Sequence, residues 1–203
     1  MNTISLGPPV VSGLAAAFIV LLVGDFASTF FYHVPQHVWG KLHLRTHHDR
    51  RRSYWDHAVL SRDPAVLLDG FLGAVPYIVL AIACSTISVV GAIAGLVLGQ
   101  LHVWWRHTTE LGWCTPSWVR IAARGLQVVL PEDHDRHHKD PEIEFGDIFR
   151  FYDAPARATM VHLRAWTRAL KGRAPLKRRT PASVAARRRA ATMKRRTVAK
   201  IPS

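Results

Sequence analysis

The chain has 203 residues, enough for one domain, and carries a formal net charge of +13. The segment from Lys171 to Ser203 holds 12 of the 27 Lys and Arg residues and no acidic residue, so the remainder is almost neutral. This distribution argues against a nucleic-acid-binding protein as a whole. Cys84 and Cys114 form no CxxC pair, so neither a disulfide framework nor a thiolate zinc site is indicated.

The first element in the chain is a long apolar segment. From Pro8 to Tyr32 there is no Lys or Arg, and Asp25 is the single acid. A run of about 20 apolar residues is long enough to cross a bilayer as a helix. A secretory signal peptide is the alternative, but the basic segment that would precede it is missing. We therefore expect a retained membrane helix over about residues 9–32, in which Asp25 has a functional or a helix-packing role.

A polar segment rich in His and Arg follows, and then a second apolar stretch. Pro64 to Leu101 contains no Lys, Arg or Glu, and Asp69 is its only charged residue. The stretch is too long for one span, so it predicts two helices, over about 65–84 and 87–105, hinged near Ser85 to Ser88. Glycines at four-residue spacing predict a close-packing face on the second of these helices: Gly91, Gly95 and Gly99.

Basic residues indicate the topology. All Lys and Arg lie either between residues 41 and 62 or from residue 106 onward. Under the positive-inside rule, both stretches are cytoplasmic. The sequence thus predicts an all-α integral membrane protein, in the bacterial inner membrane or the endoplasmic reticulum, with a helical cap on the cytoplasmic face.

Two further segments complete the expected organisation. Residues 115–130 mix apolar, aromatic and basic residues, which is typical of a helix in the membrane interface or of a soluble core helix. A helical stretch is expected through Ala169, which gives a membrane domain over residues 1–170. Residues 171–203 predict a disordered basic tail that contacts anionic lipid, and their lack of aromatic residues argues against specific nucleic-acid binding.

Ten of the 12 histidines fall into four clusters. Residues at i, i+3 and i+4 lie on one face of a helix, so the last cluster can offer three imidazoles to one metal ion. A solvated polar turn would explain one such cluster, but not four. The clusters are His33 and His37; His43, His47 and His48; His102 and His107; His134, His137 and His138.

The number of histidines bears on the metal. Both iron and zinc accept imidazole, but a single zinc site closes with four ligands. Ten histidines suit two metal ions with four or five nitrogens each, and the H-E-x-x-H motif of zinc hydrolases is absent. Two iron ions at a membrane face indicate activation of dioxygen against a lipid C–H bond. The alternative is a histidine-rich membrane protein that binds or transports zinc.

The four clusters resemble those of the fatty acid hydroxylase/sterol desaturase superfamily, which are integral membrane di-iron enzymes. The resemblance covers about Asp25 to Asp153 and includes Arg62-Asp-Pro64, Phe145-Gly146 and Tyr152-Asp153. It implies two iron ions, with zinc as a possible occupant. It also implies hydroxylation or desaturation of a fatty-acyl, sterol, carotenoid or related lipid with dioxygen. Because no electron-transfer domain is fused, a separate electron-transfer protein is implied.

Three features depart from the family pattern. The second cluster has three residues rather than two between His43 and the adjacent pair His47 and His48, which spreads its nitrogens more widely than those of the fourth cluster. Pro35 lies inside the first cluster, where it predicts a kinked helix. His102 and His107 are five residues apart, about 140° around a helix, so either a bulge aligns them or one is not a ligand. His162 is expected to be a surface residue. The residues expected to orient ligand imidazoles are Asp25, Asp49, His57, Asp133, Asp135 and Asp140, although a surface or structural role is the alternative for His57.

Overall fold

The computed structural model of the chain describes residues 7–48, 54–55 and 63–173. Regular structure in these residues is helical, apart from one isolated bridge between Val128 and Phe149, so the predicted all-α class is confirmed. Asp49, His57, Arg62 and the tail from residue 174 lie outside the described residues. The chain divides into two units, residues 1–165 and 166–203, and each is considered by itself.

The N-terminal helix is continuous although its geometry changes twice. It begins as α1 (Pro8–Ser28), widens to a π-helical turn, η1 (Thr29–His33), and continues as α2 (Val34–Val38). The π-turn lies directly before Pro35, where the sequence predicts a kink. A π-turn admits one additional residue, and such turns are frequent at functional sites. The helix therefore stays unbroken while the direction of the following side chains changes.

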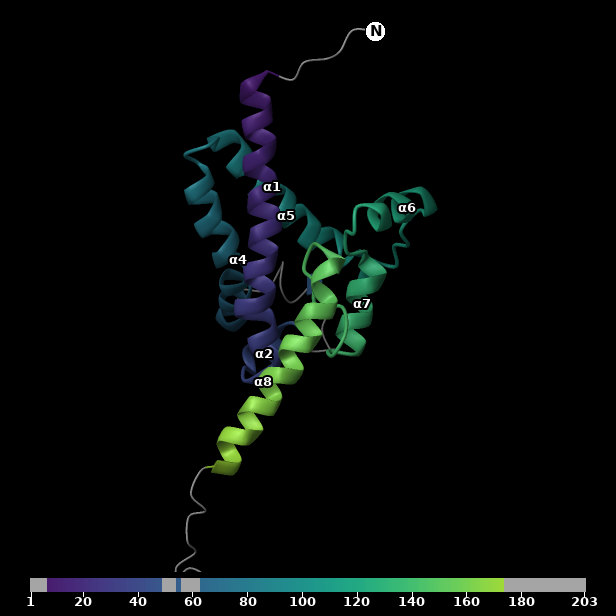
Figure 1. Ribbon diagram of the computed structural model, residues 1–203. Helices are drawn as coiled ribbons and strands as arrows, with labels where there is room; N and C mark the ends of the chain where they lie inside the picture. Colours follow the sequence, from purple (N-terminus) through teal and green to yellow (C-terminus); the bar gives the residue numbers. More distant parts are fainter. Residues whose placement is uncertain (1–6, 49–53, 56–62, 174–203) are drawn as a thin grey trace, which may run out of the picture. The chain divides into compact units, whose positions relative to one another are not determined.

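A helical hairpin packs against α1 (Figure 1). Its arms are α4 (Pro64–Cys84) and α5 (Val89–Trp105), and the turn between them lies where the sequence predicts the hinge. Side-chain caps begin both arms: the Asp63 carboxylate accepts the amide of Ala65, and the Ser88 hydroxyl accepts that of Gly91. Pro8–Val38 and Pro64–Cys84 are long and apolar enough to cross a membrane, and α5 is a shorter apolar helix.

Glycines allow α5 to lie directly against α1. A Cβ atom at Gly91 would lie 2.2 Å from the Gly13 carbonyl oxygen, and one at Gly95 would lie 2.9 Å from the Val20 Cβ atom. Larger side chains at these two positions would separate the helices, so the predicted close-packing face is confirmed there. A small core forms at this contact from Ala16, Val20, Ala81, Cys84 and Ala92.

The remaining elements form a cap at the end of α1 that carries the histidines. They are α3 (Leu42–Thr46), η3 (Thr108–Leu111), α6 (Ser117–Gly125), α7 (Pro131–Lys139), η4 (Arg150–Tyr152) and α8 (Asp153–Arg173). Val34, Phe145, Ala156 and Met160 form its core. On α6, Trp118 is 74% exposed and Ile121 is 73% exposed, which excludes a core helix. Its place in the membrane interface stays a prediction.

Candidate metal centre

Nine of the ten histidines predicted as ligands converge in two adjoining groups, which we call the first and second histidine groups. Within each group, one ring nitrogen from every member lies within 4.8 Å of the others. The first histidine group is His33, His37, His43, His48 and His137. The second histidine group is His47, His107, His134 and His138.

Neighbouring histidines in the sequence are divided between the two groups. His47 and His48 belong to different groups, and so do His137 and His138. His47 and His48 follow the end of α3, where the backbone leaves regular helical geometry. Adjacent side chains on a helix point about 100° apart, so His137 and His138 of α7 can contribute to two sites side by side. The prediction that α7 offers three imidazoles to one ion is therefore wrong. His134 and His138, one turn apart, share the second group, whereas His137 joins the first.

His102 lies outside both groups. Its Nε2 atom is 3.1 Å from the Asp147 carbonyl oxygen. Helix α5 ends at Trp105, so His107 follows the end of the helix and is not bound to helical geometry. The unusual spacing of five residues is thereby explained: only His107 reaches the second group.

Backbone carbonyls fix the tautomers of three ring systems. The Nδ1 atoms of His33, His107 and His137 lie 3.0, 2.7 and 2.5 Å from the carbonyl oxygens of Phe145, Val103 and Ile143, respectively. A carbonyl oxygen can only accept, so each Nδ1 carries the proton and donates. The Nε2 atom of each ring therefore presents a lone pair to its group.

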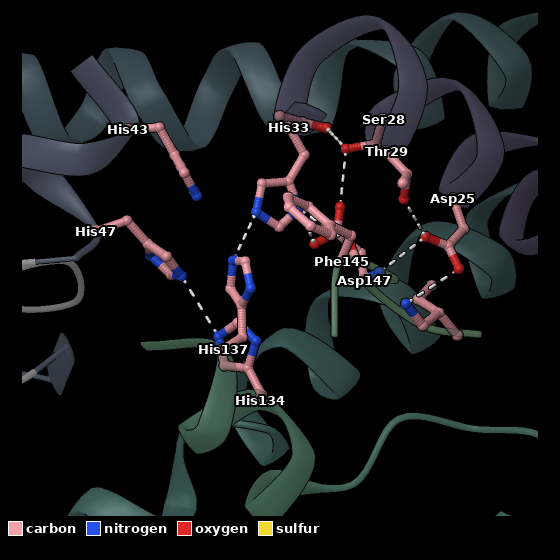
Figure 2. A network of polar contacts seen from close by, with 12 residues as sticks. Asp25, Ser28, Thr29, His33, His43, His47, His134, His137, Phe145 and Asp147 are labelled. Atoms are coloured by element: carbon pink, nitrogen blue, oxygen red, sulfur yellow. Dashed lines mark hydrogen bonds and ion pairs between the residues drawn. The ribbon is translucent and has the colours of Figure 1, made fainter. Parts of the chain in front are cut away.

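In the first group two of these lone pairs face each other: the Nε2 atoms of His33 and His137 are 3.0 Å apart (Figure 2). In the second group the Nε2 atom of His107, which carries a lone pair, lies 3.0 Å from the Nε2 atom of His134. Two such nitrogens repel unless a cation lies between them. Ligands about 2.1 Å from a metal ion are separated by about 3.0–3.4 Å, which agrees with these distances. The facing nitrogens thus fit a metal ion in each group.

The other members of the first histidine group support the same conclusion. Buried ring nitrogens on three of them have no hydrogen-bond partner within the described part of the chain: Nε2 of His37, Nε2 of His43 and both nitrogens of His48. A buried polar atom without a partner costs about 1–3 kcal/mol, and a metal bond removes that cost. Imidazole donors of this number suit iron or zinc and do not distinguish them.

Burial keeps these imidazoles neutral. It lowers the pKa of His137 to about 4, although the hydrogen bond to the Ile143 carbonyl opposes the shift. The pKa values of His47, His107 and His134 are also held well below the ordinary histidine value, chiefly by burial, and then by neighbouring histidines for His47 and by Arg106 for His107 and His134. A neutral imidazole is the form that binds a metal ion.

We expect metal retention and stability to fall together on acidification. The unfolded chain takes up protons at about pH 6.5, whereas folded His137 resists protonation until about pH 4. Stability from these rings is therefore complete above about pH 6.5 and decreases as the pH falls towards 4. Metal content after equilibration at stepwise lower pH measures the effect. A thermal stability that does not decrease between about pH 6.5 and pH 4, or metal retention that stays flat well below pH 4, contradicts an all-histidine site.

Two carboxylates that sequence reasoning did not assign lie beside the histidines. Asp69 Oδ2 accepts from His43 Nδ1 at 3.2 Å and from the Thr46 hydroxyl at 2.9 Å, and the Tyr32 hydroxyl donates to its other oxygen. Asp69 is the only charged residue between Pro64 and Leu101, and a lone charge in an apolar segment was a signal for a functional role. It orients the His43 ring.

Asp147 is the second unassigned carboxylate. Its Oδ1 atom is 2.7 Å from Arg106 Nη1 and 3.7 Å from His33 Nδ1, and Ser28 donates to its Oδ2 atom at 3.0 Å. Burial opposes its ionisation, but the Arg106 guanidinium lowers the pKa of Asp147 below the usual range. The carboxylate of Asp147 therefore stays ionised, paired with Arg106, 3.7 Å from the His33 ring.

Replacing Asp69 tests its orienting role. Asp69→Ala is expected to weaken metal binding about 10–100-fold, because the His43 ring loses the acceptor that sets its tautomer and direction. Asp69→Asn, which keeps an acceptor oxygen, is expected to lose less. Titration of the metal-free protein with Fe²⁺ under anaerobic conditions gives the affinity. The matched control is Asp135→Ala, and equal affinities in all three variants contradict the assignment.

The carboxylates that the sequence predicted have other partners. Asp25 accepts the backbone amides of Asp147, Ile148 and Phe149, so it fixes the segment under the site and does not contact an imidazole directly. The carboxylates on and after α7 form ion pairs and hydrogen bonds on or next to that helix. Asp133 pairs with Arg136 and Arg150, Asp135 pairs with Lys139, and Asp140 accepts the Glu142 amide.

Aromatic residues enclose the second histidine group. The Tyr54 ring stacks on His107 with centroids 3.6 Å apart and planes 9° apart, and the indole of Trp55 donates to the His107 carbonyl at 3.1 Å. Sequence reasoning missed this contact because it joins residues more than fifty positions apart. His162 is exposed on α8, as expected.

Comparison with known families agrees with the arrangement of the histidines. Residues 17–157 match the family described as Fatty acid hydroxylase, which covers more than half of the chain. The chain belongs to the fatty acid hydroxylase family. The matched residues include both histidine groups, Asp25, Asp69 and Asp147. No curated protein and no solved structure matches the chain. The resemblance predicted from the four clusters is thereby confirmed.

Proposed function

We propose that this fatty acid hydroxylase family member is a membrane-bound di-iron oxygenase. It hydroxylates or desaturates a C–H bond of a fatty-acyl, sterol, carotenoid or related lipid, using dioxygen and electrons from a separate protein. The observation that carries the proposal is the convergence of nine imidazoles into two adjoining groups. A single zinc site is complete with four ligands, so nine imidazoles exceed what one zinc ion requires, whereas two neighbouring redox-active ions suit dioxygen chemistry.

Each histidine group would hold one iron ion, with His102 outside both. When bound, the ions supply dioxygen activation and the oxidising power to break a lipid C–H bond. The residues of the chain orient the ligand rings and keep them neutral. Carbonyl oxygens and Asp69 hold the rings in the tautomer that presents Nε2, and burial keeps protons off them. Because His47 and His48, and likewise His137 and His138, are neighbours in the sequence that belong to different groups, the two groups lie adjacent.

The predicted topology supports proposals for the remaining partners. By the positive-inside rule, the histidine groups face the cytoplasm, where a soluble electron donor can reach them. The same rule places the basic tail beside anionic lipid headgroups at that surface. Lipid substrate arrives from the bilayer, because both long apolar helices that lead to the histidines are candidate spans.

The identity of the bound metal and the lipids of cells that express the chain test the proposal. The full chain is purified in detergent, its metals are measured by mass spectrometry, and lipids of cells that express it are compared with those of cells that express His138→Ala. We expect about two iron ions per chain and an oxidised lipid only with the unaltered chain. Zinc as the sole metal, together with an unchanged lipid profile, would favour the zinc-binding alternative.

A further inference from the structure

A cavity of about 800 Å³ lies between α4 and α5 and reaches both histidine groups. Its inner end is lined by His33 and His43 of the first group and by His47 of the second. This volume is in the range of sites that enclose a small organic ligand. The two helices separate from their shared turn (Figure 1), and the cavity occupies the space between them near the histidines.

The walls of the cavity change character along its length. At the histidine end, polar side chains line it, among them Tyr32, Thr46 and Tyr54. Further along the hairpin, the lining residues include Ala74, Ile78, Leu96 and Val97. A ligand that fills this space therefore has a hydrocarbon portion along the apolar wall. The end of the ligand that lies nearest the histidines contacts the polar side chains.

The cavity opens to the outer surface of the hairpin. Leu67, Phe71 and Val97 line it, and yet their exposed fractions are 56%, 57% and 51%. These residues belong to helices α4 and α5, whose outer surface is apolar. In a membrane such a surface meets lipid hydrocarbon, so the opening leads into the bilayer and not into water.

Its length suits one extended chain. The lining residues on α4 run from Val66 to Ile78, and twelve residues of helix at 1.5 Å each span about 18 Å. An extended chain advances about 3.5 Å for every three bonds, so about 18 Å holds roughly 15 bonds. A single hydrocarbon tail of lipid length fits along this wall.

Gly70 lines the cavity and contributes no side chain to it. It lies one residue after Asp69, and a Cβ atom built on it would meet nothing within 4 Å. No packing contact in the described fold requires a glycine there, and an ordinary helix position disfavours one by about 1 kcal/mol relative to alanine. The absence of a side chain at Gly70 leaves open space in the cavity wall, next to Asp69, which orients His43.

We propose that Gly70 is the specificity-determining position of the α4–α5 cavity, because its missing side chain decides which extended hydrocarbon chains can pass along α4 to the histidines. The proposal rests on the proposed function for the chemistry that follows binding, but the binding site itself stands on the cavity. Larger residues at Gly70 would narrow the passage next to the histidines, so they would exclude a chain without altering a metal ligand.

Photo-crosslinking of the full chain tests the proposal. The probe is stearic acid with a diazirine in its chain, added to the metal-loaded protein in lipid nanodiscs. We expect adducts on peptides that cover residues 66–78 and 96–104. Gly70→Trp is expected to lower this labelling at least about tenfold. Leu68→Trp is the matched control, because Leu68 is an exposed residue of the same helix and does not line the cavity.

Metal content separates binding from folding. Gly70→Trp should keep the metal content of the unaltered chain, and Gly70→Leu replaces it if the tryptophan variant does not fold. Adducts outside the two stretches, or undiminished labelling in a folded Gly70 variant, overturn the cavity assignment even if lipid oxidation is observed. Adducts in the cavity of a protein that oxidises no lipid support the binding site and contradict the proposed function instead.

Discussion

His138→Ala is expected to abolish lipid oxidation and to lower bound iron at least about tenfold. The Nε2 atom of His138 lies 3.1 Å from that of His47 and 3.0 Å from that of His134, so its ring closes the second histidine group. Truncation removes one metal bond and leaves only three imidazoles in a group of four. Iron per chain, measured by mass spectrometry on the purified variant, gives the result.

Two histidine variants provide controls of matched chemistry. His162→Ala changes an exposed ring on α8 and should leave iron and activity unchanged. His102→Ala alters a ring that contacts the Asp147 carbonyl and belongs to neither group, so iron content should persist. Unchanged iron in the His138 variant, or equal loss in all three variants, contradicts the assignment of the second group.

Local rules predicted the helices because their signals are local. The apolar runs, the absence of charge between Gly70 and Gly99 and the glycine spacing on α5 depend only on neighbouring residues, and the structure confirms these features. The histidines that belong to the site were recognisable for the same reason. Their clustering is visible in the sequence, and of the ten clustered histidines, all of which the structure describes, only His102 lies apart from the two groups.

The division of the histidines between two groups was not predictable from spacing. It depends on where helices end: α3 ends at Thr46 and α5 ends at Trp105, so His47, His48 and His107 leave regular helical geometry. It depends also on the π-turn before Pro35, which alters the directions of His33 and His37. A one-residue change in a helix end redirects a ring by about 100°, and helix ends are the least certain feature of any sequence pattern.

The groups that orient the histidines were also beyond local rules. Carbonyl acceptors such as that of Phe145 belong to the backbone, so no residue type marks them. Asp25 shows the same limit. Its position before His33 predicted a contact with a ligand or with a helix, but apart from the Thr29 hydroxyl its partners are amides more than 120 positions away in the sequence. Contacts of that range come only from the folded chain.

Asp25→Ala is expected to be the most destabilising carboxylate variant in the chain. Asp25 is fully buried, and its oxygens accept the amides of Asp147, Ile148 and Phe149 at 3.1, 3.1 and 2.6 Å (Figure 2). Alanine leaves three buried N–H donors without an acceptor, at about 1–3 kcal/mol each, so the loss is at least about 3 kcal/mol. Thermal unfolding in detergent should show a decrease in Tm of about 6–12 °C.

The consequence extends to the metal because the segment held by Asp25 carries the acceptor for His33. Phe145, whose carbonyl fixes the His33 tautomer, lies two residues before the first of the three amides. Loss of the anchor should therefore reduce bound iron as well as Tm. Asp25→Asn keeps one acceptor oxygen and should fall between the alanine variant and the unaltered chain. Asp135→Ala, which breaks only a surface pair with Lys139, should change Tm by no more than about 2 °C. If Asp25→Ala matches Asp135→Ala in Tm and iron content, the carboxylate does not anchor the segment beneath the first histidine group.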